Sequence, residues 1–226
     1  MNVSEAVASR FSTRAFLDRP VSKQTVFSIL ERARRAPSGG NLQPWFVYVL
    51  AGPVLEDFKA LVQRRPEPPR VGEGSEYPVY PPKLKEPYRS RRFKCGEDLY
   101  ASLQIPRDDK GARLEQYAKN LDFFGAPVAM FFALDRIMGP NQWAHLGMFM
   151  QTIMLLAREE GLHTCAQEAW ARWHKTVAEF LELPGELMLY CGMAIGYADE
   201  SAPINRWRTD RVPVEEFAQF RGFDNG

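Results

Sequence analysis

One long apolar run constrains the fold of this chain more than any other feature. Residues 127–134 read Pro-Val-Ala-Met-Phe-Phe-Ala-Leu, without a charged side chain. A strand that is apolar at every position is typically covered on both faces, so we expect other layers on each side of it. Two further apolar runs predict strands at residues 46–50 and 187–197.

Helical patterns separate these strands. Apolar spacing of three and four predicts a helix that has Ser22 as its N-cap and runs through Arg35. A helix at 146–157 is apolar almost all round, so we expect it to be buried, either at the centre of the domain or in a subunit interface. The sequence therefore predicts an α+β three-layer sandwich. Further helices are predicted at 4–10, 54–62, 97–104, 112–124 and 173–181.

A proline-rich segment interrupts this pattern. Residues 64–87 hold seven of the 17 prolines, and proline favours neither a helix interior nor a central strand. The region 64–120 also has too little apolar mass for a core of its own. We therefore expect a single domain over residues 1–226, in which 64–120 is an irregular inserted lid or excursion.

Composition excludes several classes of protein. With 226 residues, 45% apolar and 25% charged, the chain is typical of a soluble globular protein. A formal net charge of +1 argues against a nucleic-acid partner, and no stretch predicts a signal peptide or a membrane span. Three cysteines without a Cys-x-x-Cys pair predict a reducing, cytoplasmic location and no disulfide framework, and no cluster of residues predicts a metal site.

A polar turn lies between the second helix and the first strand. Residues 36–45 read Ala-Pro-Ser-Gly-Gly-Asn-Leu-Gln-Pro-Trp, and Pro37 ends the helix before them. Gly39 and Gly40 permit a positive φ or a close approach to a ligand. The turn is either a tight connection or a ligand-binding loop. Trp45 is interpreted as a core aromatic residue.

Three other stretches carry a recognisable pattern together with this turn. Residues 9–16 read Ser-Arg-Phe-Ser-Thr-Arg-Ala-Phe, and residues 161–170 read Gly-Leu-His-Thr-Cys-Ala-Gln-Glu-Ala-Trp. Near the end, Gly-Met-Ala-Ile-Gly-Tyr at 192–197 precedes Ala-Pro-Ile-Asn-Arg at 202–206. In this order, from about residue 2 to 220, the stretches resemble the FMN-dependent nitroreductase family. The resemblance implies a nitroreductase-like α-β-α sandwich with a mixed, mostly antiparallel sheet.

The resemblance also implies how FMN is held. A phosphate close to dianionic needs fixed cations, and the planar fork of arginine suits its oxygens. By resemblance, Arg10 and Arg211 hold the phosphate, Ser12 contacts the ribityl end, and Arg14 lies near the pyrimidine edge of the flavin. Each arginine taken alone is typical of a solvated surface. Arg208 is a further candidate, with either it or Arg206 facing solvent.

Two more segments match the cofactor-binding pattern of the family. Pro37, Ser38, Gly39 and Asn41 match the segment along the flavin ring and ribityl chain. Ala166, Gln167 and Glu168 match the segment whose backbone amides face the reactive nitrogen of the flavin. For Gln167 and Glu168, the alternative is the first turn of a helix, where the dipole favours an acidic residue.

The implied activity is reduction of a nitroaromatic compound in two-electron steps, with NADH or NADPH as the donor in a ping-pong cycle. The flavin supplies this chemistry, so we assign no catalytic side chain. The resemblance implies a homodimer with FMN at the interface, each site built from both chains. Alternatives on the same scaffold are reductive dehalogenation, enone or quinone reduction and flavin cleavage. A flavin-binding or nucleic-acid-binding protein without turnover is the alternative of another class.

Two features stay open at this point. The basic and aromatic cluster at 88–94, Tyr-Arg-Ser-Arg-Arg-Phe-Lys, is a solvated lid face, a nucleic-acid patch, or a contact for the phosphate of the nicotinamide donor or for an anionic substrate. His145 stands where many relatives carry an acidic residue. The sequence favours a surface or helix-end position for it over a contact with a partner or with the site.

Overall fold

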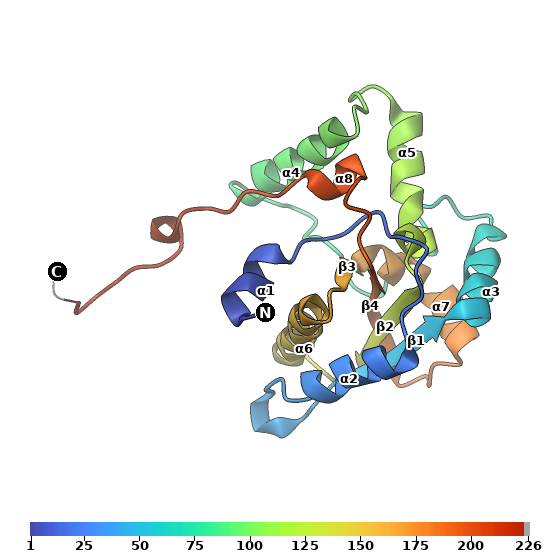
Figure 1. Ribbon diagram of the computed structural model, residues 1–226, viewed down its shortest axis with the longest axis horizontal. Coiled ribbons are helices and arrows are strands. Elements are labelled where there is room, and N and C mark those ends of the chain that lie inside the picture. The colour runs from blue at the N-terminus through green and yellow to red at the C-terminus, as the bar shows by residue number, and fades with distance from the viewer. Residues whose placement is uncertain (224–226) are drawn as a thin grey trace.

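The computed structural model describes residues 1–223 and contains a four-stranded antiparallel sheet of order β1-β2-β4-β3 (Figure 1). The central pair is β2, Val128–Asp135, and β4, Leu187–Gly196, and the edges are β1, Phe46–Ala51, and β3, His163–Gln167. The three strands predicted from apolar runs are confirmed within one residue at each end. The mixed character of the sheet is a single parallel bridge between Ser12 and Thr164.

Side chains that alternate along β2 reach two separate cores, which makes the fold a three-layer sandwich. Met130 and Phe132 pack with α2, Lys23–Ala33, and α6, Pro140–Glu159. Ala129 and Phe131 pack on the other face with α3, Gly52–Gln63, and α7, His174–Leu181. The predicted α+β sandwich, with helices covering both faces of the sheet, is confirmed.

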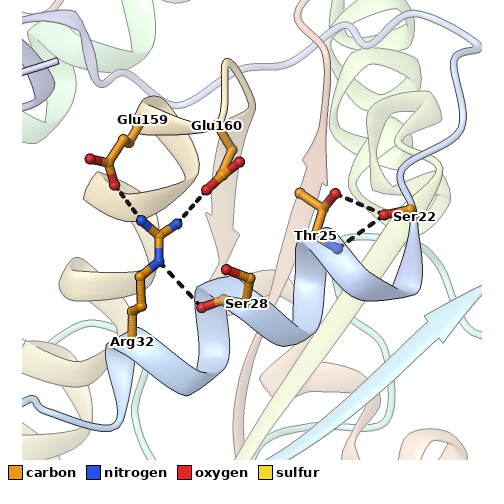
Figure 2. A network of polar contacts seen from close by, with 6 residues as sticks. All are labelled: Ser22, Thr25, Ser28, Arg32, Glu159 and Glu160. Carbon is orange, nitrogen blue, oxygen red and sulfur yellow. Dashed lines mark hydrogen bonds and ion pairs between the residues drawn. The ribbon is translucent and has the colours of Figure 1, made fainter.

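The second helix begins where the sequence predicts (Figure 2). Oγ of Ser22 accepts a hydrogen bond from the backbone N–H of Thr25 at 3.0 Å, which satisfies one amide of the first turn. At its other end, the Arg32 guanidinium contacts Glu159 and Glu160 of α6, both at 2.5 Å. These exposed ion pairs align α2 along α6, and buried apolar side chains supply most of the stabilisation.

The apolar helix α6 is buried on one face only. Phe149 and Ile153 lie in the core, and Trp45 stacks on Phe149 with ring centroids 4.6 Å apart, which confirms Trp45 as a core residue. Met148 on the opposite face is 43% exposed. A position at the centre of the domain is therefore excluded for this helix, and its burial in a subunit interface stays a prediction.

The excursion contains more helix than the sequence predicts. The helix expected at 97–104 is α4, Tyr88–Ser102, which starts nine residues earlier than predicted. The prediction missed its first turns because they are charged and carry no apolar stripe. The helix expected at 112–124 is α5, Lys110–Ala118, followed by a 3-10 segment, Lys119–Gly125. Phe123 and Phe124 adopt positive φ angles of 50° and 57°, which an α-helix cannot accommodate.

Short elements complete the chain. They are α1, Val3–Ser9, a 3-10 turn at Gly39–Asn41, a 3-10 helix at Glu168–Trp173, α8, Pro203–Arg206, and a 3-10 turn at Val214–Glu216. The last of these lies on a C-terminal arm, residues 207–223, that extends beyond the body of the molecule (Figure 1). Among residues 1–223, no helix combines the length and the hydropathy that a bilayer span requires.

Candidate functional site

A broad cavity of about 1830 Å³ opens beside the end of β3. Residues from distant parts of the chain line it, including Arg14, the segment from Cys165 to Ala169 and the segment from Thr209 to Pro213. Helices α4 and α5 of the excursion form another wall. Pockets for drug-sized ligands are typically about 300–1,000 Å³, so this cavity has room for a cofactor and a second ligand.

Arg10 and Arg211 approach each other from the two ends of the chain. Burial lowers the pKa of the Arg10 guanidinium, and the positive charge of Arg211 lowers it further. Among residues 1–223, neither side chain makes an ion pair; Arg211 donates only to Thr209 and to the carbonyl of Asp210. Two neighbouring cations without an acid suit a multiply charged anion.

The extended segment between Arg10 and Arg14 is fixed to the edge of the sheet. Ser12 pairs with Thr164 of β3, and the N–H of Thr13 donates to the Thr164 carbonyl at 3.0 Å. Arg14 donates to the Ser12 carbonyl at 3.3 Å and lines the cavity. The charges of Arg14 and Arg10 both oppose the rise in pKa that burial imposes on Cys165, so both guanidiniums act electrostatically on that thiol.

Asn205 is a residue that the sequence analysis missed. It is buried in α8 and accepts a hydrogen bond from the Arg14 N–H at 2.9 Å. Its amide nitrogen donates to the carbonyls of Ala15 at 2.7 Å and Asp199 at 2.8 Å. Asn205 thereby joins α8, which precedes the C-terminal arm, to the Arg14 segment. Its place inside the Ala202–Arg206 motif was the signal available in the sequence.

Arg208 lies outside the cavity lining. Its guanidinium carbon is 3.7 Å from the ring centroid of Phe11, and it donates to the Asn205 carbonyl at 2.5 Å. Arg206 is exposed and donates to the Glu200 carbonyl at 3.4 Å. Of these two candidates, Arg208 therefore contacts the segment beside Arg10, whereas Arg206 faces solvent.

The end of β3 forms part of the cavity lining. Ala166 and Gln167 are the last residues of β3, and Gln167 is also the N-cap of a 3-10 helix that begins at Glu168, so the first turn of a helix does lie here. Gln167 is buried and donates to the Asn120 carbonyl at 2.8 Å, while its Oε1 has no partner among the described residues. Burial by surrounding protein raises the pKa of the Glu168 carboxyl, although the residue keeps contact with solvent.

The turn at 37–41 is a separate group. Its residues Pro37, Ser38, Gly39 and Asn41 do not line the cavity. Oγ of Ser38 accepts from the Gln43 N–H at 2.9 Å, which closes the turn. The Gly39 N–H donates to Nε2 of His145 at 3.3 Å. The chain thus brings the arginines and β3 together, but it does not bring this turn to them.

His145 is half-buried on α6 rather than on the surface. A Cβ added at Gly39 would lie 3.1 Å from Cε1 of His145, so the imidazole fills the space that glycine leaves free. The helix-end position that the sequence favoured for His145 agrees with its place in the second turn of α6, although the side chain is half-buried. The side chain supports the polar turn.

The basic cluster of α4 lies on the cavity wall, where several of its charges are neutralised. Arg91 pairs with Glu216 at 3.1 Å, and Lys94 pairs with Asp98 at 2.5 Å and Asp210 at 2.8 Å. Two of these acids belong to the C-terminal arm, so the pairs hold the arm against the excursion. Within the described residues, no group of three histidine, cysteine or acidic side chains is placed to hold a metal ion.

Comparisons with known proteins agree on one family. A family model described as "Nitroreductase family" matches residues 7–197. The chain is 39% identical over 218 residues to a 4-nitrobenzoate reductase of Pseudomonas putida, covering 96% of this chain and 95% of the relative. Among solved structures it is similar to the FMN and NADPH-dependent nitroreductase NfnB of Sphigopyxis sp. strain HMH, with 46% identity, a TM-score of 0.91 and coverage of 99% and 100%. It is also similar to the FMN-dependent nitroreductase NfnB of Mycobacterium smegmatis in complex with NADPH, with 28% identity, a TM-score of 0.89 and coverage of 96% and 97%. The chain therefore belongs to the nitroreductase family.

Proposed function

We propose that this protein is an FMN-dependent oxidoreductase that uses NADPH or NADH to reduce nitroaromatic compounds. The observation that carries the proposal is the approach of Arg10 and Arg211, without an acidic partner among residues 1–223, in a chain of this family. The relatives named for 4-nitrobenzoate and nitrobenzene reduction support the substrate class, and the NfnB structures support both cofactors.

The residues present fit FMN on two counts. The neighbouring guanidiniums of Arg10 and Arg211 match a phosphate group, which accepts paired N–H donors from arginine. The buried Oε1 of Gln167 has no partner among the described residues and needs a donor, which the N–H of a flavin ring provides. Both features lie along β3: Ser12, two residues after Arg10, bridges Thr164, and Gln167 is the last residue of the strand.

In this proposal each residue has a binding or orienting role. Arg10 and Arg211 hold the phosphate, with Arg208 supporting their segment through Phe11. Ser12 contacts the ribityl end, and Ala166, Gln167 and Glu168 lie along the ring. Arg14 brings positive charge to the ring, where it favours the anionic reduced form. FMN, when bound, would supply hydride transfer between the nicotinamide and the nitro group. Solvent water would supply the protons that nitro reduction consumes, so no side chain is assigned as an acid or base.

We further propose a homodimer in which the turn of one copy completes the site of the other. Pro37, Ser38, Gly39 and Asn41 do not line their own chain's cavity, which leaves them available to a partner. Apolar side chains outside the core support an interface: Met148 is 43% exposed and Phe217 is 70% exposed. An obligate interface of this kind buries more than about 2,000 Å².

The excursion and the cellular setting complete the proposal. We propose that residues 1–226 form one domain, of which residues 224–226 lie outside the described part of the chain. The proposal is supported by the cavity that α4 and α5 line together with the end of β3. The excursion at 64–120 then shapes the space for the substrate. All three cysteines are free, with Cys165 and Cys191 buried, which supports a reducing, cytoplasmic setting.

A visible spectrum of the purified protein, followed by NADPH oxidation with nitrobenzene, tests the proposal. We expect a flavin absorption spectrum, loss of that absorption when the nicotinamide is added, and NADPH consumption that depends on the nitro compound. Parallel assays with a halophenol, an enone and a quinone separate the other reactions of this scaffold. Yellow protein that oxidises neither nicotinamide with any acceptor would contradict an enzymatic role.

A further inference from the structure

A second cationic group lies in the same cavity, away from the family motifs. Arg70 comes from the proline-rich segment and Arg172 from the 3-10 helix after β3, and both line the cavity together with Tyr117 of α5. The guanidinium carbon of Arg70 is 5.2 Å from the ring centroid of Tyr117. Both arginines oppose the rise in pKa that burial imposes on the Tyr117 hydroxyl, which places both charges near that phenol.

Neither arginine is neutralised within the described part of the chain. Arg70 donates to the hydroxyl of Tyr100 at 3.1 Å, and neither it nor Arg172 makes an ion pair there. Some other cations of the cavity wall are paired: Arg89 pairs with Glu86 at 2.7 Å, and Lys94 pairs with two carboxylates. The charge of Arg70 and Arg172 is therefore free for a ligand.

The position of Arg172 is fixed by its backbone. Its carbonyl accepts a hydrogen bond from the Glu73 N–H at 2.7 Å. Gly72 approaches so closely, at a φ of +59°, that an added Cβ would lie 2.3 Å from this carbonyl oxygen. The neighbouring Trp173 is fully buried. The backbone is thus committed to packing, which holds the start of the side chain at a defined place on the cavity wall.

We propose that Arg70, Arg172 and the Tyr117 hydroxyl form an anion subsite that binds the carboxylate or phosphate monoester of a ligand lying in the cavity. Two planar guanidiniums and one O–H donor match the oxygens of such a group, and the face of Tyr117 orients Arg70. The inference rests on the proposed function and deepens it. The anion is either a carboxylate on the nitroaromatic substrate or the 2′-phosphate that distinguishes NADPH from NADH.

The test compares Michaelis constants in Arg70→Gln and Arg172→Gln variants. One arm measures KM for 4-nitrobenzoate against KM for neutral nitrobenzene, and the other measures KM for NADPH against KM for NADH. We expect either variant to raise one of these two ratios about tenfold. A change in the first ratio assigns the subsite to the substrate, and a change in the second assigns it to the donor. Unchanged ratios in both arms would overturn the subsite.

Arg89→Gln is the matched control, because Arg89 lines the same cavity but is paired with Glu86. We expect both ratios to stay at the parental values in this variant. An equal shift would show a general effect of cavity charge and would overturn the subsite. If Arg172→Gln folds poorly, Arg172→Lys is the second variant. It keeps the positive charge, so we expect its KM ratios to lie between those of the parent and those of a variant without the charge.

A binding measurement separates this inference from the proposed function. Calorimetry with benzoate and with adenosine 2′-monophosphate needs no turnover, and we expect Arg172→Gln to weaken one of them about tenfold. If the parent protein reduces nitrobenzene, and the parent and the Arg172→Gln variant bind both probes with equal affinity, the subsite is refuted while the proposed function stands. A parent that reduces no nitro compound would refute the proposed function, while the calorimetry would still decide the subsite.

Discussion

Two parts of the proposed flavin site differ in how they are built. One is the arginine region, made of residues 10–14, β3 and residues 205–211, and the other is the polar turn at 37–41. Arg10 and Arg211 come together only because the tertiary fold joins the two ends of the chain, and they carry charge without an acidic partner within residues 1–223. The turn at 37–41 is local: Ser38 bonds to Gln43 five residues away, and one imidazole supports Gly39. The difference suggests that mutations should disturb the first region through folding and charge, and the second through local geometry.

The largest expected effect comes from Asn205→Ala in the arginine region. The change leaves the Arg14 N–H without an acceptor. The carbonyls of Ala15 and Asp199 each lose the Asn205 amide but keep a second donor, the N–H of Asp199 and of Ala202. Because one buried donor without a partner costs about 1–3 kcal/mol and each of the two lost amide bonds about 0.5–1.5 kcal/mol, we expect the free energy of unfolding to fall by about 3 kcal/mol. Urea unfolding measures this loss. Arg206→Ala, in the next and exposed position, is the control and should change stability by less than about 0.5 kcal/mol.

A pair of glycine substitutions compares packing in the two regions. Gly192 lies opposite Gln167 in the sheet, and an added Cβ would be 2.4 Å from Cδ1 of the buried Trp170. We expect Gly192→Ala to destabilise by about 2 kcal/mol through overpacking. Gly40 in the turn has a φ of +59° and nothing within 4 Å of an added Cβ, so Gly40→Ala should cost only about 1 kcal/mol. Thermal unfolding that ranks the two in the reverse order would contradict this comparison.

Ser38→Ala tests how independent the turn is. The hydroxyl accepts one exposed hydrogen bond from the Gln43 N–H, so its loss should lower the free energy of unfolding by about 1 kcal/mol or less. The arginine region should keep its structure, since it shares no contact with this hydroxyl. Ser4→Ala on the exposed face of α1 serves as the reference. A loss of several kcal/mol in denaturant unfolding would show that the turn supports the core.

The last prediction concerns pH and a histidine beside the arginines. Burial, with help from Arg158 and Arg208, lowers the pKa of His163 to about 4 from the usual 6.5. Between these values the unfolded chain binds a proton that the folded chain does not, so acidification from pH 6.5 to 4 should lower the free energy of unfolding. Urea unfolding across this range measures the slope. His163→Asn should reduce it, and an identical slope would contradict the assignment.

The sequence predicted those elements whose residues follow a simple apolar pattern. β1, β2 and β4 are rich in apolar residues, and the N-cap at Ser22 is confirmed by its hydrogen bond to Thr25. β3 was missed as a strand because it is short and contains His163, Thr164 and Gln167. It forms because β4 pairs with one of its edges and Ser12 bridges the other.

The site was less predictable because long-range contacts assemble it. No spacing in the sequence indicates that Arg10 and Arg211 meet, and their pairing was expected only from the family resemblance. The roles of Asn205 and His145 depend on backbone groups more than 100 residues away, at Arg14 and Gly39. Residue type alone cannot reveal such partners, because an asparagine or histidine on the surface looks the same in the sequence as one that contacts a distant backbone group.

The central claim is that Arg10 and Arg211 hold the phosphate of FMN. The direct test is the ratio of the dissociation constants for riboflavin, which has no phosphate, and FMN, measured by fluorescence quenching in the parent, Arg10→Ala and Arg211→Ala proteins. Charge-assisted hydrogen bonds of about 1.5–3 kcal/mol predict that the parent prefers FMN and that each variant loses about 10- to 100-fold of this preference. Equal affinity of the parent for riboflavin and FMN, or an unchanged preference in both variants, would contradict the account.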